Sequence, residues 1–177
     1  MAYGARVFSK GVILSSLLLA VAVMWTGVVS NVHWLIGLGV LAGSALLGVA
    51  VGRLVPPRPM PMLLLLGILS VADIVWIASG GGSATGSVER VVNFSMQIGE
   101  SSSSIGTVDL VLAAVITTHW LQRDAGIWLA IAAAPIGMVA SNAYVAVSGA
   151  DNLPLVPFIS LGWLLTEAWH RRSRREG

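Results

Sequence analysis

LGILSVADIVWIAS (residues 66–79) and SSIGTVDLVLAAVI (residues 103–116) each place one aspartate, Asp73 or Asp109, inside an otherwise apolar helical pattern. A carboxylate surrounded by hydrocarbon is costly and rare, and by default it marks a functional site. The two patterns follow one another in the chain and are joined by a single polar loop. This pair of carboxylates is therefore the starting point for assigning a function.

The composition is that of a membrane protein. Hydrophobic residues make up 56% of the 177 residues and charged residues only 10%, and the mean hydropathy is +0.86. Cysteine is absent, which excludes disulfides and thiolate metal sites, and three scattered histidines do not indicate a zinc site. We therefore expect no metal and no cofactor. The basic stretch at residues 170–175 favours an anionic membrane surface over nucleic acid, because no aromatic, foldable segment accompanies its arginines.

Hydropathy predicts an all-α polytopic membrane protein with six transmembrane helices, at about residues 11–30, 34–55, 60–79, 104–122, 127–147 and 153–169. The first helix is expected to be retained, because its apolar run is longer than that of a signal peptide. In chain order, residues 1–59 hold two helices and a basic proline-rich loop. Residues 60–170 are expected to form a catalytic four-helix core with an outer loop at 80–103, and residues 171–177 a basic tail.

Basic residues gather on one side of the predicted bundle. An even number of helices places both termini on the same side, and that side receives all but one of the basic residues: Arg6, Lys10, Arg53, Arg58, Arg123, Arg171, Arg172, Arg174 and Arg175. Only Arg90 is on the other side. The excess of basic residues on cytoplasmic loops then predicts a cell-membrane protein with cytoplasmic termini. The loops at 80–103 and 148–152 face outward in this arrangement.

Residues 92–98 alternate apolar and polar side chains, a period of two that predicts a strand or an extended segment within the outer loop. An extended segment of this kind has free backbone groups to which an unwound substrate could add as a further strand.

The two aspartates are predicted to lie at one depth. Asp73 is about six residues before its helix meets the outer loop, and Asp109 is about five residues after the next helix leaves it. At about 1.5 Å per residue, both carboxylates lie roughly 8–9 Å below the same surface. Close carboxylates in a low-dielectric site do not both ionise easily, so one can act as a base and the other as an acid, as in an aspartic protease. Structural hydrogen bonds, a cation site and a proton path remain open alternatives.

The order of motifs resembles the presenilin and signal-peptide-peptidase family of intramembrane aspartyl proteases. In that family an aspartate follows a tyrosine, a second aspartate closes a G-x-G-D motif, and the last helix begins with P-A-L. The corresponding stretches of this chain are Ala72-Asp73, Gly106-Thr107-Val108-Asp109 and Leu153-Pro154-Leu155-Val156-Pro157. The resemblance covers about residues 60–170 and implies that Asp73 and Asp109 are catalytic. It also implies that the remaining residues of the last two motifs bind substrate: Gly106, Thr107, Val108, Leu153, Pro154, Leu155 and Val156.

The chain departs from the family pattern at defined places. Ala72 replaces the tyrosine, and Val108 replaces the glycine that gives the substrate backbone room. The family usually has nine helices, so the first two helices here would correspond to its fourth and fifth. The predicted orientation resembles that of the signal-peptide-peptidase branch.

The resemblance implies that the partners are transmembrane segments or signal-peptide remnants as substrates, the lipid bilayer, and further copies of the chain in a homo-oligomer. The rival hypotheses are a proton- or cation-coupled transporter or channel that uses the same carboxylates, and an inactive scaffold that binds helices. His119 and Glu167 are expected to be peripheral, snorkelling toward a membrane surface or facing polar neighbours.

Overall fold

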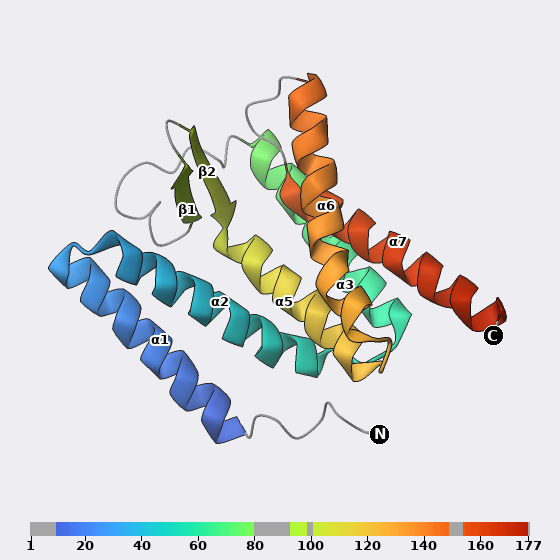
Figure 1. Ribbon diagram of the computed structural model, residues 1–177, viewed down its shortest axis with the longest axis horizontal. Coiled ribbons are helices and arrows are strands. Elements are labelled where there is room, and N and C mark those ends of the chain that lie inside the picture. Colours follow the sequence, from blue (N-terminus) through green and yellow to red (C-terminus); the bar gives the residue numbers. More distant parts are fainter. Residues whose placement is uncertain (1–9, 80–92, 99–100, 149–153, 177) are drawn as a thin grey trace. The chain divides into compact units, whose positions relative to one another are not determined.

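The computed structural model describes residues 10–79, 93–98, 101–148 and 154–176 (Figure 1). Six helices occur in this part of the chain: α1 (Lys10–Ser30), α2 (His33–Leu54), α3 (Pro59–Ala78), α5 (Thr107–Gln122), α6 (Ile127–Ser148) and α7 (Leu155–Glu176). They correspond in order to the six predicted helices. The main difference is the length of α7, which was expected to end near Trp169. Arginine is a good helix former and is stabilised near a helix C-terminus, so the basic tail continues the helix.

Four of these helices are long and apolar enough to cross a membrane: Gly11–Ser30, His33–Leu54, Pro59–Ala78 and Ile127–Ser148. This agrees with the predicted class of membrane protein. Helix α5 has 16 residues and therefore extends about 24 Å, less than the roughly 30 Å of a bilayer's hydrocarbon core. Helix α7 is amphipathic and ends in arginines. The count of six membrane spans stays a prediction for these two reasons.

A two-stranded hairpin precedes α5. Strand β1 (Asn93–Ile98) pairs with strand β2 (Ser101–Gly106) in antiparallel register, with Asn93 opposite Gly106 and Ile98 opposite Ser101. Strand β1 coincides with the alternating stretch that was predicted to be extended, although Val92 lies outside the described residues. Strand β2 was not predicted, because its run of serines has no alternation to reveal a strand.

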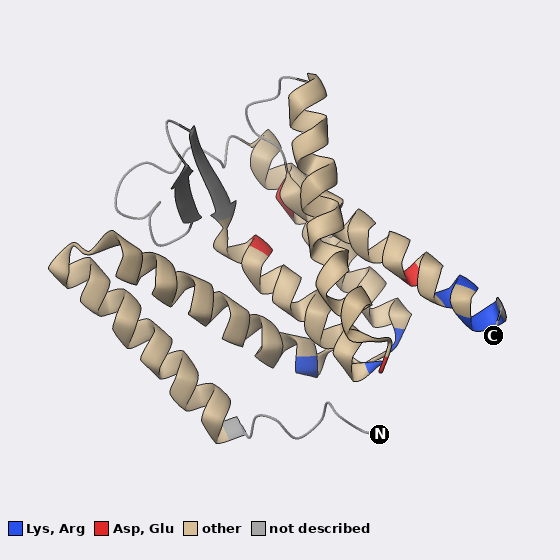
Figure 2. Cartoon of the chain, in the orientation of Figure 1, with Lys and Arg blue, Asp and Glu red and all other residues tan. Residues whose placement is uncertain are grey.

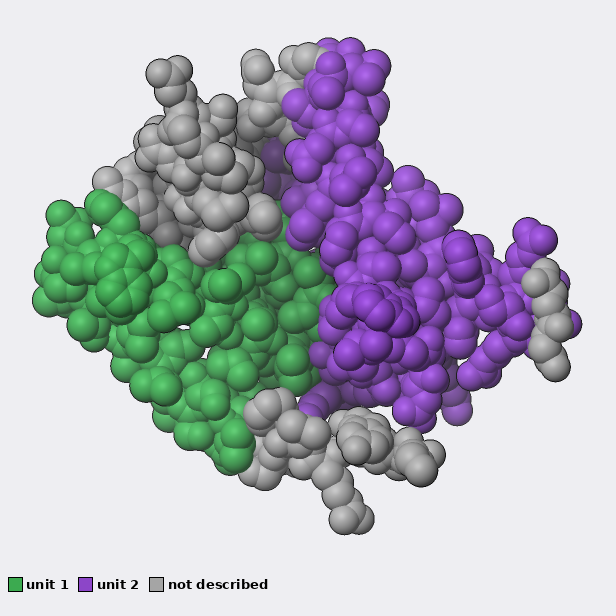
Figure 3. Space-filling view, in the orientation of Figure 1, with its two compact units in different colours: residues 1–51, 84–114 green, residues 52–83, 115–177 purple. Residues whose placement is uncertain are grey.

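The chain divides into two compact units (Figure 3), and each is described by itself. The first comprises residues 1–51 and 84–114, and the second comprises residues 52–83 and 115–177. The first unit thus holds α1, most of α2, the hairpin and the beginning of α5. The second holds α3, the rest of α5, α6 and α7.

Helix α7 is the centre of the second unit, where it packs against both α3 and α6. Its crossing with α6 is made by two glycines. A Cβ on Gly162 would lie 2.1 Å from the carbonyl oxygen of Ala133, and a Cβ on Gly137 would lie 2.3 Å from the carbonyl oxygen of Phe158. The two backbones are therefore in direct contact, which is how small residues join helices in the absence of a hydrophobic driving force.

We expect Gly162→Ala to lower the stability of the protein, because the new methyl group must push α6 and α7 apart. Overpacking of this kind costs typically about 1–3 kcal/mol. Gly67→Ala in α3 is the matched control, since a Cβ there meets nothing within 4 Å. Thermal unfolding of the purified variants in one detergent should show a clearly lowered midpoint for Gly162→Ala only. Equal midpoints for the two variants would contradict the backbone contact.

Candidate functional site

Asp73 contacts the beginning of α7. Its carboxylate oxygen Oδ2 accepts a hydrogen bond from the backbone N–H of Val156, with an N···O distance of 3.0 Å. The two residues are 83 positions apart in the sequence. Asp73 is half-buried near the C-terminal end of α3, and Val156 is buried in the first turn of α7. The contact therefore joins an aspartate of α3 to the proline motif that opens the last helix.

The sequence explains why this contact forms. The first four N–H groups of a helix, here at residues 154–157, have no partner within the helix. Pro154 and Pro157 have no N–H, so only Leu155 and Val156 are left as donors. A negative charge near a helix N-terminus is stabilised by the partial positive charge there. Asp73 therefore caps α7 from another helix.

A second polar contact joins α3 to α7 one turn away. The hydroxyl oxygens of Ser70 and Ser160 lie 3.0 Å apart, and the Ser160 hydroxyl donates to the Val156 carbonyl oxygen at 2.8 Å. Ser70 precedes Asp73 by three residues, and Ser160 follows Val156 by four, so each pair lies on one face of its helix. These two contacts fix the register of α3 against α7.

Asp109 likewise accepts a hydrogen bond at a helix N-terminus, that of its own helix α5. Its Oδ2 accepts a hydrogen bond from the Gly106 N–H at 3.1 Å. Gly106 ends β2 and directly precedes α5, so Asp109 is the third helical residue and reaches back to the cap, as the acidic residue of a capping box does. Val108 beside it is exposed. The carboxylate thus fixes the junction between the hairpin and α5.

The structure brings the predicted site residues together in two groups. Asp73 meets Val156, next to Pro154 and Leu155, in the second unit. Asp109 meets Gly106 at the hairpin–α5 junction, with Thr107 and Val108 between them in the chain, in the first unit. Leu153 lies outside the described residues. The pairing of the two carboxylates stays a prediction.

A buried ionic cluster in the second unit was not predicted. The carboxylate of Glu167 in α7 is paired with the guanidinium of Arg123 through both Nη atoms, and its Oε1 also accepts from Arg171 Nε at 2.7 Å. The Glu167 side chain is only 6% exposed. The Arg123 guanidinium also lies 4.8 Å from the ring centroid of Trp120. Glu167 does have polar neighbours, as expected, but it is a buried charge and not a peripheral one.

The expectation for His119 was wrong. Its side chain is fully buried and packs between Trp120 and Trp163, with ring centroids 6.2 and 6.0 Å away. Neither ring nitrogen has a hydrogen-bond partner among the described residues. The aromatic rings of two helices enclose the imidazole and leave it no route to a surface. The helical spacing of Trp163, Glu167 and His170 indicates one stripe on α7, but it gives no signal that His119 of α5 packs against that stripe.

His170 completes the stripe beyond the predicted membrane span. Its ring lies 5.5 Å from that of Trp120 in an edge-on arrangement. Burial lowers the pKa of His170, and the positive charges of Arg174 and Arg123 lower it further. Burial and the neighbouring arginines therefore both favour the neutral imidazole.

Among the described residues, no group of three or more histidine, aspartate or glutamate side chains could hold a metal ion. No protein-family model, curated protein or solved structure matches the chain.

We expect Asp73→Ala to destabilise the protein, because it leaves the Val156 N–H without its acceptor. A lost cap or an unsatisfied buried donor costs about 1–3 kcal/mol. Asp73→Asn keeps a side-chain oxygen at the same place and should cost less than half as much. Thermal unfolding in detergent compares the three proteins, and amide hydrogen exchange at Val156 reports the cap directly. If Asp73→Ala is as stable and as well protected as wild type, the cap does not contribute.

Proposed function

We propose that the protein is an intramembrane aspartyl protease of the presenilin type, with Asp73 and Asp109 as its catalytic pair. In this proposal all six helices span the cell membrane and both termini are cytoplasmic. The observation that carries it is the hydrogen bond between Asp73 and Val156. The resemblance assigns one of these residues to catalysis and the other to the proline motif beside the site. Their contact supports that assignment, because chain order alone gives no reason for them to meet.

Charge at the site supports the same chemistry. Both aspartates bond to N–H groups at helix N-termini, where negative charge is stabilised. A helix N-terminus would stabilise the single negative charge of two carboxyl groups that share one proton. With Oδ2 of Asp73 held by Val156, Oδ1 is the oxygen that takes a proton from the attacking water. Protonated Asp109 then polarises the scissile carbonyl.

The hairpin supports a mode of substrate binding. A helical substrate must be unwound before its peptide bonds can be attacked, and an unwound segment in a membrane needs partners for its backbone. The hairpin has two strands, so each has an edge that pairs with no other described strand. Strand β2 runs directly into the turn that carries Asp109. A transmembrane segment or signal-peptide remnant added to this edge would lie along the chain that leads to the carboxylate.

We expect the purified protein to cleave a labelled transmembrane peptide in detergent or lipid, and we expect Asp73→Asn and Asp109→Asn each to abolish cleavage. Loss of a general acid or base typically costs at least about 100-fold in rate. Asp124→Asn is the matched control, because this exposed residue has a φ of 50° that asparagine tolerates. Cleavage that persists in either site variant would overturn the proposal.

One observation favours a second candidate, a proton- or cation-coupled transporter. Within the predicted span, polar groups follow the buried face of α7 at helical spacing, at residues 156, 160, 163 and 167. These residues cover about 16 Å, roughly half the thickness of a bilayer core. Ionisable residues facing a bundle interior are typical of proton pathways.

Flux measurements separate the two candidates. Under the leading proposal, liposomes that contain the protein and a pH-sensitive dye should show no more proton flux than empty liposomes when a potential is applied. A flux that falls severalfold in Asp73→Asn, and not in Asp124→Asn, would favour the transporter. Absence of both cleavage and flux would favour the scaffold hypothesis.

A further inference from the structure

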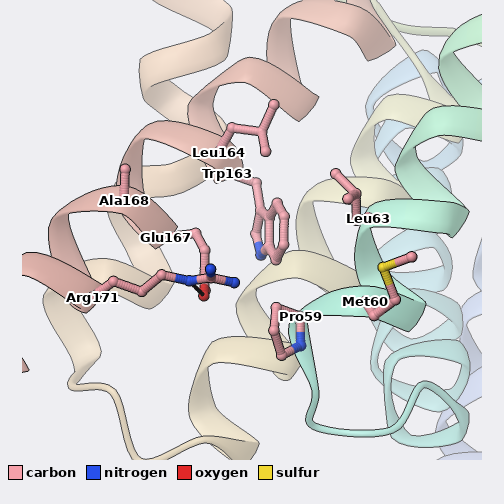
Figure 4. Close-up of a pocket in the computed structure, with 8 residues that line it drawn as sticks. All are labelled: Pro59, Met60, Leu63, Trp163, Leu164, Glu167, Ala168 and Arg171. Carbon is pink, nitrogen blue, oxygen red and sulfur yellow. Dashed lines mark hydrogen bonds and ion pairs between the residues drawn. The ribbon is translucent and has the colours of Figure 1, made fainter.

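A groove lies between the beginning of α3 and residues 163–171 of α7, all within the second unit (Figure 4). Its volume is about 370 Å³. Pro59, Met60 and Leu63 line it from α3, and Trp163, Leu164 and Arg171 are among its residues from α7. Pro59 opens a candidate membrane span, and Arg171 follows the apolar part of α7. The groove therefore lies at the depth where lipid headgroups meet their acyl chains.

One end of the groove carries a hydrogen-bond donor with no partner. The indole of Trp163 is 1% exposed, and its Nε1 has no acceptor among the described residues. Figure 4 shows the indole ring pointing toward the groove opposite Leu63, with its nitrogen on the side of Glu167 and Arg171. Buried donors are nearly always satisfied in native proteins, so this N–H calls for an acceptor.

The same end carries a net positive charge. Glu167 is paired with two arginines, Arg123 and Arg171, so the three groups together have a charge of +1. The Arg171 side chain is 59% exposed and uses only its Nε in the pair. Figure 2 shows that further basic residues follow along the C-terminal end of α7. An acceptor at this end of the groove would therefore be favoured if it were anionic.

The rest of the lining is mainly apolar. Met60, Leu63 and Leu164 belong to it, and their side chains are largely exposed. A ligand that matches both parts of the groove has an anionic oxygen at one end and a hydrocarbon chain at the other.

We propose that this groove binds one anionic phospholipid. Its phosphate accepts hydrogen bonds from Trp163 Nε1 and from the guanidinium of Arg171, and one acyl chain lies along Met60, Leu63 and Leu164. This site does not depend on Asp73 or Asp109, so it stands apart from the proposed protease activity.

The test is native mass spectrometry of the full chain released from detergent, titrated with phosphatidylglycerol or with phosphatidylcholine of the same acyl chains. We expect one phosphatidylglycerol to bind at least about fivefold more tightly than phosphatidylcholine, the factor that one arginine contributes at a membrane surface. Trp163→Phe keeps an aromatic ring and removes the N–H donor, and Arg171→Gln removes the charge. Each should weaken phosphatidylglycerol binding about fivefold.

Arg174→Gln is the matched control, because it removes the same charge from the same helix outside the groove. Its binding should stay within about twofold of wild type. Leu63→Trp fills the groove from the exposed side of α3 and should abolish the tight site without touching the core. Thermal unfolding checks that each variant is folded. Equal weakening by Arg174→Gln and Arg171→Gln, or unchanged binding in folded Leu63→Trp, would overturn the proposal. Displacement of the lipid by glycerol 3-phosphate alone would overturn the part assigned to the acyl chain.

Discussion

The buried face of α7 has polar groups that water cannot reach. The packing of the second unit depends on the hydrogen-bond and ionic partners that other parts of the unit supply to these groups. At the N-terminal end of α7 the Val156 N–H donates to Asp73, one turn further on Ser160 meets Ser70, and near the other end Glu167 pairs with Arg123. Asp73 and Ser70 come from α3, and Arg123 comes from the turn that follows α5. An unpaired polar group in an apolar interior costs several times what a surface contact contributes. Helices α3 and α7 and the end of α5 are therefore held in register by polar contacts, and apolar packing fills the space between them.

In the proposed protease, one hydrogen bond gives Asp73 two tasks. The bond to Val156 caps α7, and it also holds the carboxylate in one orientation, as a catalytic base requires. The proline motif serves both tasks, since Pro154 and Pro157 remove two of the competing donors and leave few for the aspartate to meet. Stability and reactivity are thus linked at one side chain. The Asp73→Asn and Asp73→Ala variants separate them, because the amide keeps an acceptor and loses the charge.

The sequence predicted local features well and tertiary ones unevenly. Helix positions followed from apolar runs bounded by prolines and glycines, and strand β1 followed from its alternation. The contact of Asp73 with the proline motif was anticipated only through the family resemblance. The pairing of Arg123 with Glu167 and the burial of His119 were missed, because each depends on which helices become neighbours. Residue spacing within one helix can show a stripe, but it does not name the helix that will cover it.

The crossing of α6 and α7 also sets how α7 can be placed along its axis. Gly162 is the single glycine in α7, and it sits against the Ala133 carbonyl with no room for a side chain. Sliding α7 by one turn would bring Phe158 or Thr166 to that carbonyl, and neither can fit there. The crossing therefore allows only one register of α7 against α6. It fixes the depth of the proline motif and of the arginines together, so a change at either end of α7 cannot be absorbed by a shift of the helix.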